Sequence, residues 1–315
     1  MDTQNRTVAT ELILLGFSND LNTNLLLFVI FLLIYSICLI ANCLILFLVI
    51  SNSTLHIPMY YFFCMLSVLD LCMTSSVLPK LLVDLISGQR IISLAACTAQ
   101  FYIILLLAGF EFLLLALMAY DRYVAICRPL HYSVLMRWNN CYRMTALVCI
   151  LTFIIFGLPC FGSPVNLCYP NQINHFMCEV MGVTQVSCGD IYSKEVKIVI
   201  ACFLALFLPF SFIMVSYACI LSAVLKLRSA SQAKAFSTCS SHVMVVLLFY
   251  GTSVIMYFGP TTKYSTTYGK YFSLLSNIIC PTLNPIIYCL NNKDVKEAQR
   301  KFFIKFEHLF SLRRG

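Results

Sequence analysis

Charged residues are scarce in this sequence of 315 residues, since Asp, Glu, Lys and Arg together make up only 11% of it. Soluble domains carry roughly 25% charged residues, because they need a hydrated surface. Hydrophobic residues make up 60%, and the mean hydropathy is +0.87. The composition therefore argues against the soluble domains that the length alone would favour, and it predicts that most of the surface faces lipid.

Further absences narrow the class of protein. The N-terminal segment has no basic stretch before an apolar one, and the run Leu12–Phe17 is too short for a signal peptide, so we expect the first membrane span to direct insertion. Internal repeats are absent and polar residues within the apolar stretches are few, which disfavours a transporter. No nucleophile motif appears, and His131 and His242 have no second ligand at metal spacing. We therefore expect no enzyme, no metal site and no cofactor.

Seven apolar stretches are long enough to cross a bilayer, at about 20 residues per crossing. They run over Asn24–Ile50, Pro58–Leu82, Cys97–Arg122, Met144–Gly162, Val196–Leu225, Phe236–Gly259 and Tyr271–Leu290. The predicted fold is an all-α membrane protein with a seven-transmembrane helix bundle over residues 24–290, between an N-terminal segment 1–23 and a tail 291–315. In the tail, apolar residues recur at helical spacing against a basic face and predict an amphipathic helix on the inner leaflet: Val295, Ala298, Phe302 and Phe306.

The net charge of +8 is mostly a topology signal and not a nucleic-acid patch. Thirteen of the 21 Lys and Arg residues fall in the tail and in the loops that follow spans three and five. Basic loops lie in the cytoplasm, so the chain is expected in the plasma membrane with its N-terminus outside and its C-terminus inside. The sequon Asn5-Arg6-Thr7 agrees, because it places a glycosylation site at Asn5 in the exposed segment.

Four of the 17 cysteines fall on the outer side in this topology: Cys97, Cys168, Cys178 and Cys188. An even number in an oxidising compartment predicts disulfides, with three possible pairings. The pairing Cys97–Cys178 with Cys168–Cys188 would fold the loop before span five over the mouth of the bundle. Spacing alone does not choose among the three.

Four motifs carry a resemblance to a known family. LHIPMYYF at 55–62 opens span two, MAYDRYVAIC at 118–127 closes span three, KAFSTCSSH at 234–242 opens span six, and PTLNPIIY at 281–288 closes span seven. Each closely resembles a signature of olfactory receptors, a branch of the rhodopsin-like G-protein-coupled receptors, and together they cover nearly the whole chain. The resemblance implies a receptor for small, mostly hydrophobic odorants that activates a stimulatory G protein, raises cyclic AMP and serves smell. Sensing of a metabolite in another tissue is an alternative that the sequence does not separate.

The same resemblance implies which residues couple to the G protein. Taken alone, Asp121 and Arg122 would be a charge pair that anchors span three at the membrane surface. Within the motif they are expected to form a latch that holds the inactive state and then frees Arg122. Pro285 interrupts the hydrogen bonding of span seven and predicts a hinge. The implied coupling residues are Asp121, Arg122, Tyr123, Tyr217, Asn284, Pro285 and Tyr288.

Two carboxylates, Asp70 and Glu111, fall deep in the bilayer at similar depth. A charge there costs roughly 2.5–3.5 kcal/mol, and two close carboxylates do not both stay ionised without a counter-ion. We expect a sodium ion between them. The alternative is that one or both are protonated and hydrogen-bonded to Asn42 and Asn284.

The tryptophan switch common in span six of rhodopsin-like receptors is missing, because the single Trp is Trp138, on the cytoplasmic side. Tyr250 is the candidate switch in its place, with an ordinary aromatic core residue as the alternative. The resemblance implies a ligand pocket lined by the outer halves of spans three, five, six and seven. Neighbouring turns of spans three, five and six supply the candidate residues, although each residue singly could be ordinary packing: Ile104, Leu105, Ala108, Gly109, Phe112, Ala201, Cys202, Ala205, Tyr250, Val254 and Tyr257. The pocket is mostly apolar and contains no Lys or Arg, so we expect it to disfavour acids.

Overall fold

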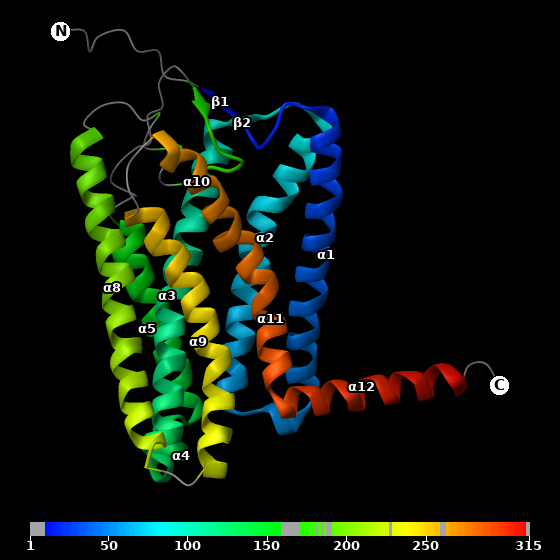
Figure 1. Cartoon of the computed structure of the whole chain (residues 1–315), viewed down its shortest axis with the longest axis vertical. Helices are drawn as coiled ribbons and strands as arrows, with labels where there is room; N and C mark the ends of the chain where they lie inside the picture. Colours follow the sequence, from blue (N-terminus) through cyan, green and yellow to red (C-terminus); the bar gives the residue numbers. More distant parts are fainter. Residues whose placement is uncertain are drawn as a thin grey trace.

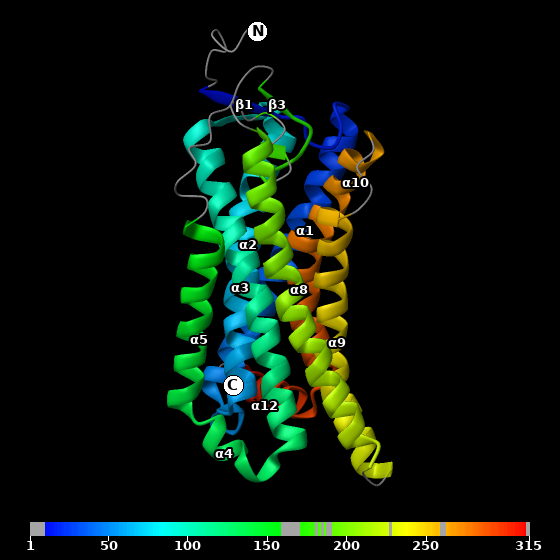
Figure 2. The ribbon, with the colours of Figure 1, turned by 90° about the vertical axis from the view of Figure 1, so that its left-hand side faces the viewer.

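The computed structural model of the chain describes residues 10–158, 171–179, 182–183, 186, 191–226, 229–258 and 263–312. Long helices lie side by side in a bundle (Figures 1 and 2). They are α1 Leu21–Ser51, α2 Pro58–Ser87, α3 Leu94–Cys127, α5 Trp138–Thr152, α8 Ile191–Val224, α9 Ser229–Phe258, α10 Lys263–Leu274 and α11 Cys280–Asn291. Within the described residues, six helices are long and apolar enough to cross a membrane.

The seventh predicted span corresponds to α10 and α11. A π-helical segment, Leu275–Ile279, joins the two helices into one continuous element. A second π-helical segment, Phe153–Gly157, extends α5 in the same way. The wider turns of the π-helical segments divide each of these two elements into shorter helices, although each element still runs along the bundle.

Local capping residues set the helix ends. The Asp20 carboxylate accepts a hydrogen bond of 2.8 Å from the Thr23 backbone N–H at the start of α1, which holds the pKa of Asp20 below its usual range. Ser93 caps α3 by accepting from Ala96 N. Gly88 ends α2 with a φ of 67°, a conformation that glycine adopts without strain. Because capping depends on polar residues outside the apolar runs, α2 and α3 extend several residues beyond the predicted spans.

A small sheet covers the end of the bundle at which α1 begins, called here the sheet end (Figure 1). Its strands are β1 Glu11–Leu14, β2 Ile91–Ser93 and β3 Gln172–Ile173, with β1 in the middle, antiparallel to β2 and parallel to β3. The inward side chains of all three strands are buried together with a disulfide between Cys97 and Cys178, whose Cα atoms lie 5.4 Å apart. The other residues predicted outside the membrane, Cys168, Cys188 and Asn5, lie outside the described part of the chain.

The core is densest around α3, which packs against α2, α5, α8 and α9. Leu114 and Leu115 of α3 are fully buried. The outer faces of the bundle instead expose large apolar side chains, among them Ile40 at 69%, Leu208 at 67% and Leu247 at 64% exposure. Such a continuous apolar exterior suits lipid and not water.

Helix α12, Lys293–Leu312, runs sideways from the opposite end of the bundle, and this end is called the α12 end (Figure 1). Val295 and Ala298 are buried against α1, α2 and the turn Ser53–Leu55 between them. The Tyr60 hydroxyl donates to Asn292 Oδ1 at 3.0 Å and so ties the start of α12 to α2. The short turn Pro129–His131 and helix α4, Tyr132–Leu135, lie at the same end.

Candidate functional site

A cavity opens inside the sheet end of the bundle, with about 620 Å³ between its lining side chains, part of it open to solvent. Helices α3, α8 and α9, the two π-helical segments and the loop after β3 all contribute to its wall. The lining residues are Phe101, Ile104, Leu105, Ala108, Phe112, Phe156, Glu179, Leu206, Phe249, Ser253, Met256, Ser276 and Asn277. A concave, mostly apolar wall with a few polar groups is typical of small-molecule sites.

Four of the residues expected in the pocket line this cavity, all on α3: Ile104, Leu105, Ala108 and Phe112. Gly109 lies under the ring of Phe156, where an added Cβ would sit 2.5 Å from two ring carbons. Val254 does not line the cavity, because its side chain is 37% exposed on the outside of α9. The side chains of the other expected residues on α8 and α9 lie outside the described part of the structure: Ala201, Cys202, Ala205 and Tyr257.

Tyr250 lies beneath the cavity and not in its wall. Its hydroxyl donates to the Phe112 carbonyl of α3 at 2.9 Å, and its ring contacts the rings of Phe112 and Phe210. Phe112 therefore takes part both in the cavity wall and, through its carbonyl, in a buried hydrogen bond between α3 and α9.

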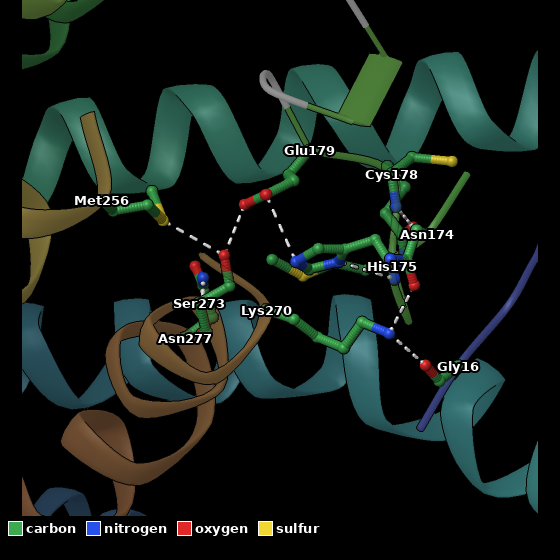
Figure 3. A network of polar contacts seen from close by, with 11 residues as sticks. Gly16, Asn174, His175, Cys178, Glu179, Met256, Lys270, Ser273 and Asn277 are labelled. Atoms are coloured by element: carbon green, nitrogen blue, oxygen red, sulfur yellow. Dashed lines mark hydrogen bonds and ion pairs between the residues drawn. The ribbon is translucent and has the colours of Figure 1, made fainter. Parts of the chain in front are cut away.

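A polar network forms the roof of the cavity (Figure 3). Glu179 accepts a hydrogen bond of 2.5 Å from the Ser273 hydroxyl through Oε2, and its Oε1 lies 3.2 Å from His175 Nε2. Lys270 Nζ donates to Gly16 O at 2.5 Å and to Asn174 Oδ1 at 2.8 Å. Burial lowers the pKa of His175, so its imidazole is neutral at pH 7.

Sequence reasoning missed Glu179. The only signal was its position next to Cys178, which a disulfide to the start of span three would bring over the bundle.

Asp70 and Glu111 are both buried inside the bundle, at 1% and 2% exposure. Asn284 Nδ2 donates to Asp70 Oδ1 at 3.0 Å. Asn42 donates instead to the carbonyls of Pro281 and Cys38. Among the described residues, Glu111 Oε1 and Asn284 Oδ1 are buried without a hydrogen-bond partner.

Asp121 and Arg122 form an ion pair at the α12 end. The Tyr132 hydroxyl donates to Asp121 Oδ1 at 2.9 Å, and burial raises the pKa of Tyr132, so this donor stays protonated. A second, smaller cavity adjoins the pair, and it is lined by Met59, Phe62, Phe63, Met118, Asp121, Arg122, His242 and Tyr288.

Tyr217 and Tyr288 lie towards the same end, whereas Asn284 lies deeper in the bundle beside Asp70. His242 Nε2 lies 3.0 Å from the Leu115 carbonyl, which only accepts, so Nε2 carries the proton and Nδ1 accepts from the Tyr217 hydroxyl at 2.8 Å. The ring of Tyr288 stacks on Phe63 at 4.1 Å, and its hydroxyl is buried without a partner among the described residues. Pro285 is buried inside α11, and Tyr123 lies beneath the Arg128 guanidinium.

The chain is similar to known proteins over almost its full length. The family model described as olfactory receptor matches residues 31–305. Olfactory receptor 5AR1 of Mus musculus is 42% identical over 97% of this chain and 99% of its own length. Olfactory receptor 10AG1 of Homo sapiens is 41% identical over 94% of this chain, and Olfactory receptor 2F1 of Homo sapiens is 41% identical over 99% of it, each covered over 99% of its length.

Proteins of this family are receptors and not enzymes, and they span the membrane as seven-helix bundles. With a family match over most of the chain and a bundle of membrane-crossing helices, this multi-pass membrane protein belongs to the olfactory receptor family, whose members detect odorants in the sense of smell.

Proposed function

We propose that this receptor binds small hydrophobic odorants in the cavity at the sheet end and responds by activating a stimulatory G protein, which raises cyclic AMP. The observation that carries the proposal is that α3 belongs to both sites. Phe112 lines the cavity and Arg122 lies at the α12 end of the same helix, roughly 15 Å away at a rise of about 1.5 Å per residue.

In the proposed topology, residues 1–23 and the sheet end face the outside, residues 24–290 form the receptor domain in the plasma membrane, and the tail 291–315 is cytoplasmic. The basic loops and α12 support this arrangement, because they lie together at the α12 end. Asn5 is then the proposed glycosylation site, and the burial of Val295 and Ala298 sets α12 along the inner leaflet.

Activation is a shift of population between two states of the bundle. The Asp121–Arg122 ion pair stabilises the inactive state, and its opening frees Arg122, with Tyr123, for the G protein. The hydrogen bond of Tyr250 to α3 links the cavity to this end, and Tyr250 is therefore the proposed switch. Movement of α11 at Pro285 is accompanied by rearrangement of Tyr217, Asn284 and Tyr288.

A sodium ion between Asp70 and Glu111 would stabilise the inactive state. The donor set fits this ion, because two carboxylates and the unpaired Oδ1 of Asn284 are hard oxygen ligands in a buried site. Protonation of one carboxyl is the alternative, and the Asn284 hydrogen bond to Asp70 is compatible with either.

Carboxylic acids are poor ligands in this proposal. Among the residues described around the cavity, the only charged one is Glu179, and it would repel a ligand carboxylate. The lining residues expected from α8, Ala201, Cys202 and Ala205, are also uncharged.

The test is cyclic AMP output in cells that express the chain, scanned against volatile alcohols, amines, ketones, esters and acids. Arg122→Ala at matched surface expression is expected to lose the dose-dependent response, because the G-protein contact is gone. Arg300→Ala, which removes an exposed basic residue of α12, is the matched control and is expected to keep it. The proposal would be refuted if Arg122→Ala kept the cyclic AMP response. It would also be refuted if the parent chain, present at the cell surface, gave no cyclic AMP response to any compound of the panel.

A further inference from the structure

Among the residues that the structure describes, the carboxylate in the roof of the cavity lacks a cationic partner. Glu179 is only 6% exposed, yet it lines the cavity. Among the described residues, its close polar partners are the Ser273 hydroxyl and the neutral His175, and Lys270 is engaged with Gly16 O and Asn174 Oδ1 instead. A buried carboxylate requires several hydrogen bonds to offset its lost hydration.

The two oxygens of Glu179 have acceptor capacity left. An ionised carboxylate offers about four acceptor positions. Ser273 occupies one on Oε2, and the imidazole lies beside Oε1. The tautomer of His175 is fixed, since its Nδ1 accepts from Met177 N at 3.2 Å and the proton therefore sits on Nε2, towards Glu179. At least one acceptor position on each oxygen remains for a group inside the cavity.

Two of the hydroxyl protons around the cavity are already used, and Ser276 contributes a further hydroxyl to the lining. Ser253 Oγ donates to the Phe249 carbonyl at 2.8 Å, and Ser273 Oγ donates to Glu179. Asn277 Nδ2 gives one hydrogen to the Ser273 carbonyl and keeps one other. The polar wall therefore presents mainly acceptors and one negative charge to a ligand.

The position of Glu179 is fixed through the residue before it. Cys178, the residue before it, is bonded to Cys97 of α3, and its backbone N–H donates to Gln100 Oε1 at 2.8 Å. Gln100 is itself held by the Ser76 carbonyl of α2. A polar group held this rigidly does not need to be ordered when a ligand arrives, so its hydrogen bond contributes fully to affinity.

We propose that Glu179 is the polar anchor of the odorant site and that it selects apolar ligands carrying an O–H or N–H donor, alcohols and amines, over ethers and esters of the same size and over acids. The inference rests on the proposed function, because it uses the same cavity. The apolar tail of the ligand lies against Ile104, Ala108 and Phe112, and its donor reaches the roof.

The test compares the parent chain with Glu179→Gln, which keeps the shape and the Ser273 contact but removes the charge. The probes are straight-chain alcohols of five to ten carbons, the corresponding primary amines, and the methyl ether isomeric with each alcohol. In the parent chain, at least one alcohol or amine is expected to act at a concentration at least tenfold below its matched ether, about 1.4 kcal/mol. In Glu179→Gln this preference is expected to fall below threefold. Amines lose more than alcohols, because the amide still accepts a hydrogen bond but no longer attracts a cation.

Glu11→Gln is the matched control, since it makes the same chemical change on an exposed residue of β1 at the same end of the bundle. It is expected to keep the full preference. Each probe is measured twice, as cyclic AMP output in cells and as thermal stabilisation of the purified receptor, which needs no G protein.

The inference would be overturned if ethers and alcohols were equally potent in the parent chain, if the preference for donors survived in Glu179→Gln, or if no probe stabilised the purified receptor. A cyclic AMP response without donor preference leaves the proposed function standing and removes the anchor. Donor-selective stabilisation without cyclic AMP leaves the anchor standing and removes the proposed coupling.

Discussion

The contact between Gly109 and Phe156 gives the most quantitative prediction for the cavity wall. A methyl group at Gly109 would lie 2.5 Å from both Cδ2 and Cε2 of the Phe156 ring. Non-bonded carbons prefer about 3.5–4.0 Å, so Gly109→Ala requires the ring to move by about 1 Å. Phe156 is 5% exposed and lines the cavity, and the ring has little room to move without narrowing that space.

Gly109→Ala is therefore expected to destabilise the receptor. Overpacking of a buried site costs about 1–3 kcal/mol, and the higher helix propensity of Ala returns about 0.5–1 kcal/mol. The difference is centred on a net loss of about 1 kcal/mol and reaches at most about 2.5 kcal/mol, so the thermal midpoint of the purified receptor falls by about 2–4 °C for each kcal/mol lost. Potency of cavity ligands falls in the same variant, because the displaced ring occupies their space.

Gly251→Ala is the matched control, since no atom lies within 4 Å of an added methyl group in the middle of α9. Its thermal midpoint is expected to stay level or rise. Phe156→Ala removes the obstructing ring, and adding Gly109→Ala in that background is expected to cost nothing. The packing argument would be contradicted if the two substitutions lowered the thermal midpoint additively in the double variant. It would also be contradicted if Gly109→Ala left both the thermal midpoint and the ligand potency unchanged.

Two further perturbations test the buried charges. Sodium suppression of basal cyclic AMP is first measured in membranes that contain the parent chain. Glu111→Gln removes one carboxylate of the proposed sodium site, so this suppression is expected to disappear in the variant. If the suppression is unchanged, protonation is the explanation for the buried Asp70 and Glu111. Burial lowers the pKa of His175 below its ordinary value of 6.5, so the folded protein binds a proton there less readily than the unfolded chain. The free energy of unfolding is therefore at its full value above pH 6.5 and declines as the pH falls from 6.5 through the lowered pKa. The thermal midpoint of the parent chain is expected to fall more steeply than that of His175→Gln between about pH 7.5 and about pH 5, and parallel profiles would show that protonation beside Glu179 and Lys270 is harmless.

The helices could be predicted from the sequence because hydropathy depends on local composition. The ends of the helices were harder to predict, because each depends on a single polar or glycine capping residue such as Asp20, Ser93 or Gly88. The sheet was not predicted at all. Its strands contain two to four residues each, and their pairing depends on segments far apart in the sequence.

The residues of the candidate site also divide into those that local sequence predicts and those that depend on packing with distant segments. The α3 positions of the cavity follow from helical spacing, since Ile104, Leu105, Ala108 and Phe112 lie on neighbouring turns. The rotation of α9 about its own axis is decided by packing with its neighbours, and for this reason the sequence did not show that Val254 faces outward. No periodicity describes a loop, so Glu179 became visible only after the disulfide and the Gln100 contact had placed it.

The central place of β1 in the sheet has a consequence for biogenesis. Its partners β2 and β3 follow roughly 80 and 160 residues later, and at about 5–20 residues per second the ribosome needs roughly 8–30 s to supply both. With the N-terminus outside, as proposed, β1 lies in the lumen of the endoplasmic reticulum without β2 for the first half of this interval and without β3 for all of it. The complete sheet over the odorant cavity therefore forms only after residue 173 has been synthesised, and quality control can retain the chain during this interval.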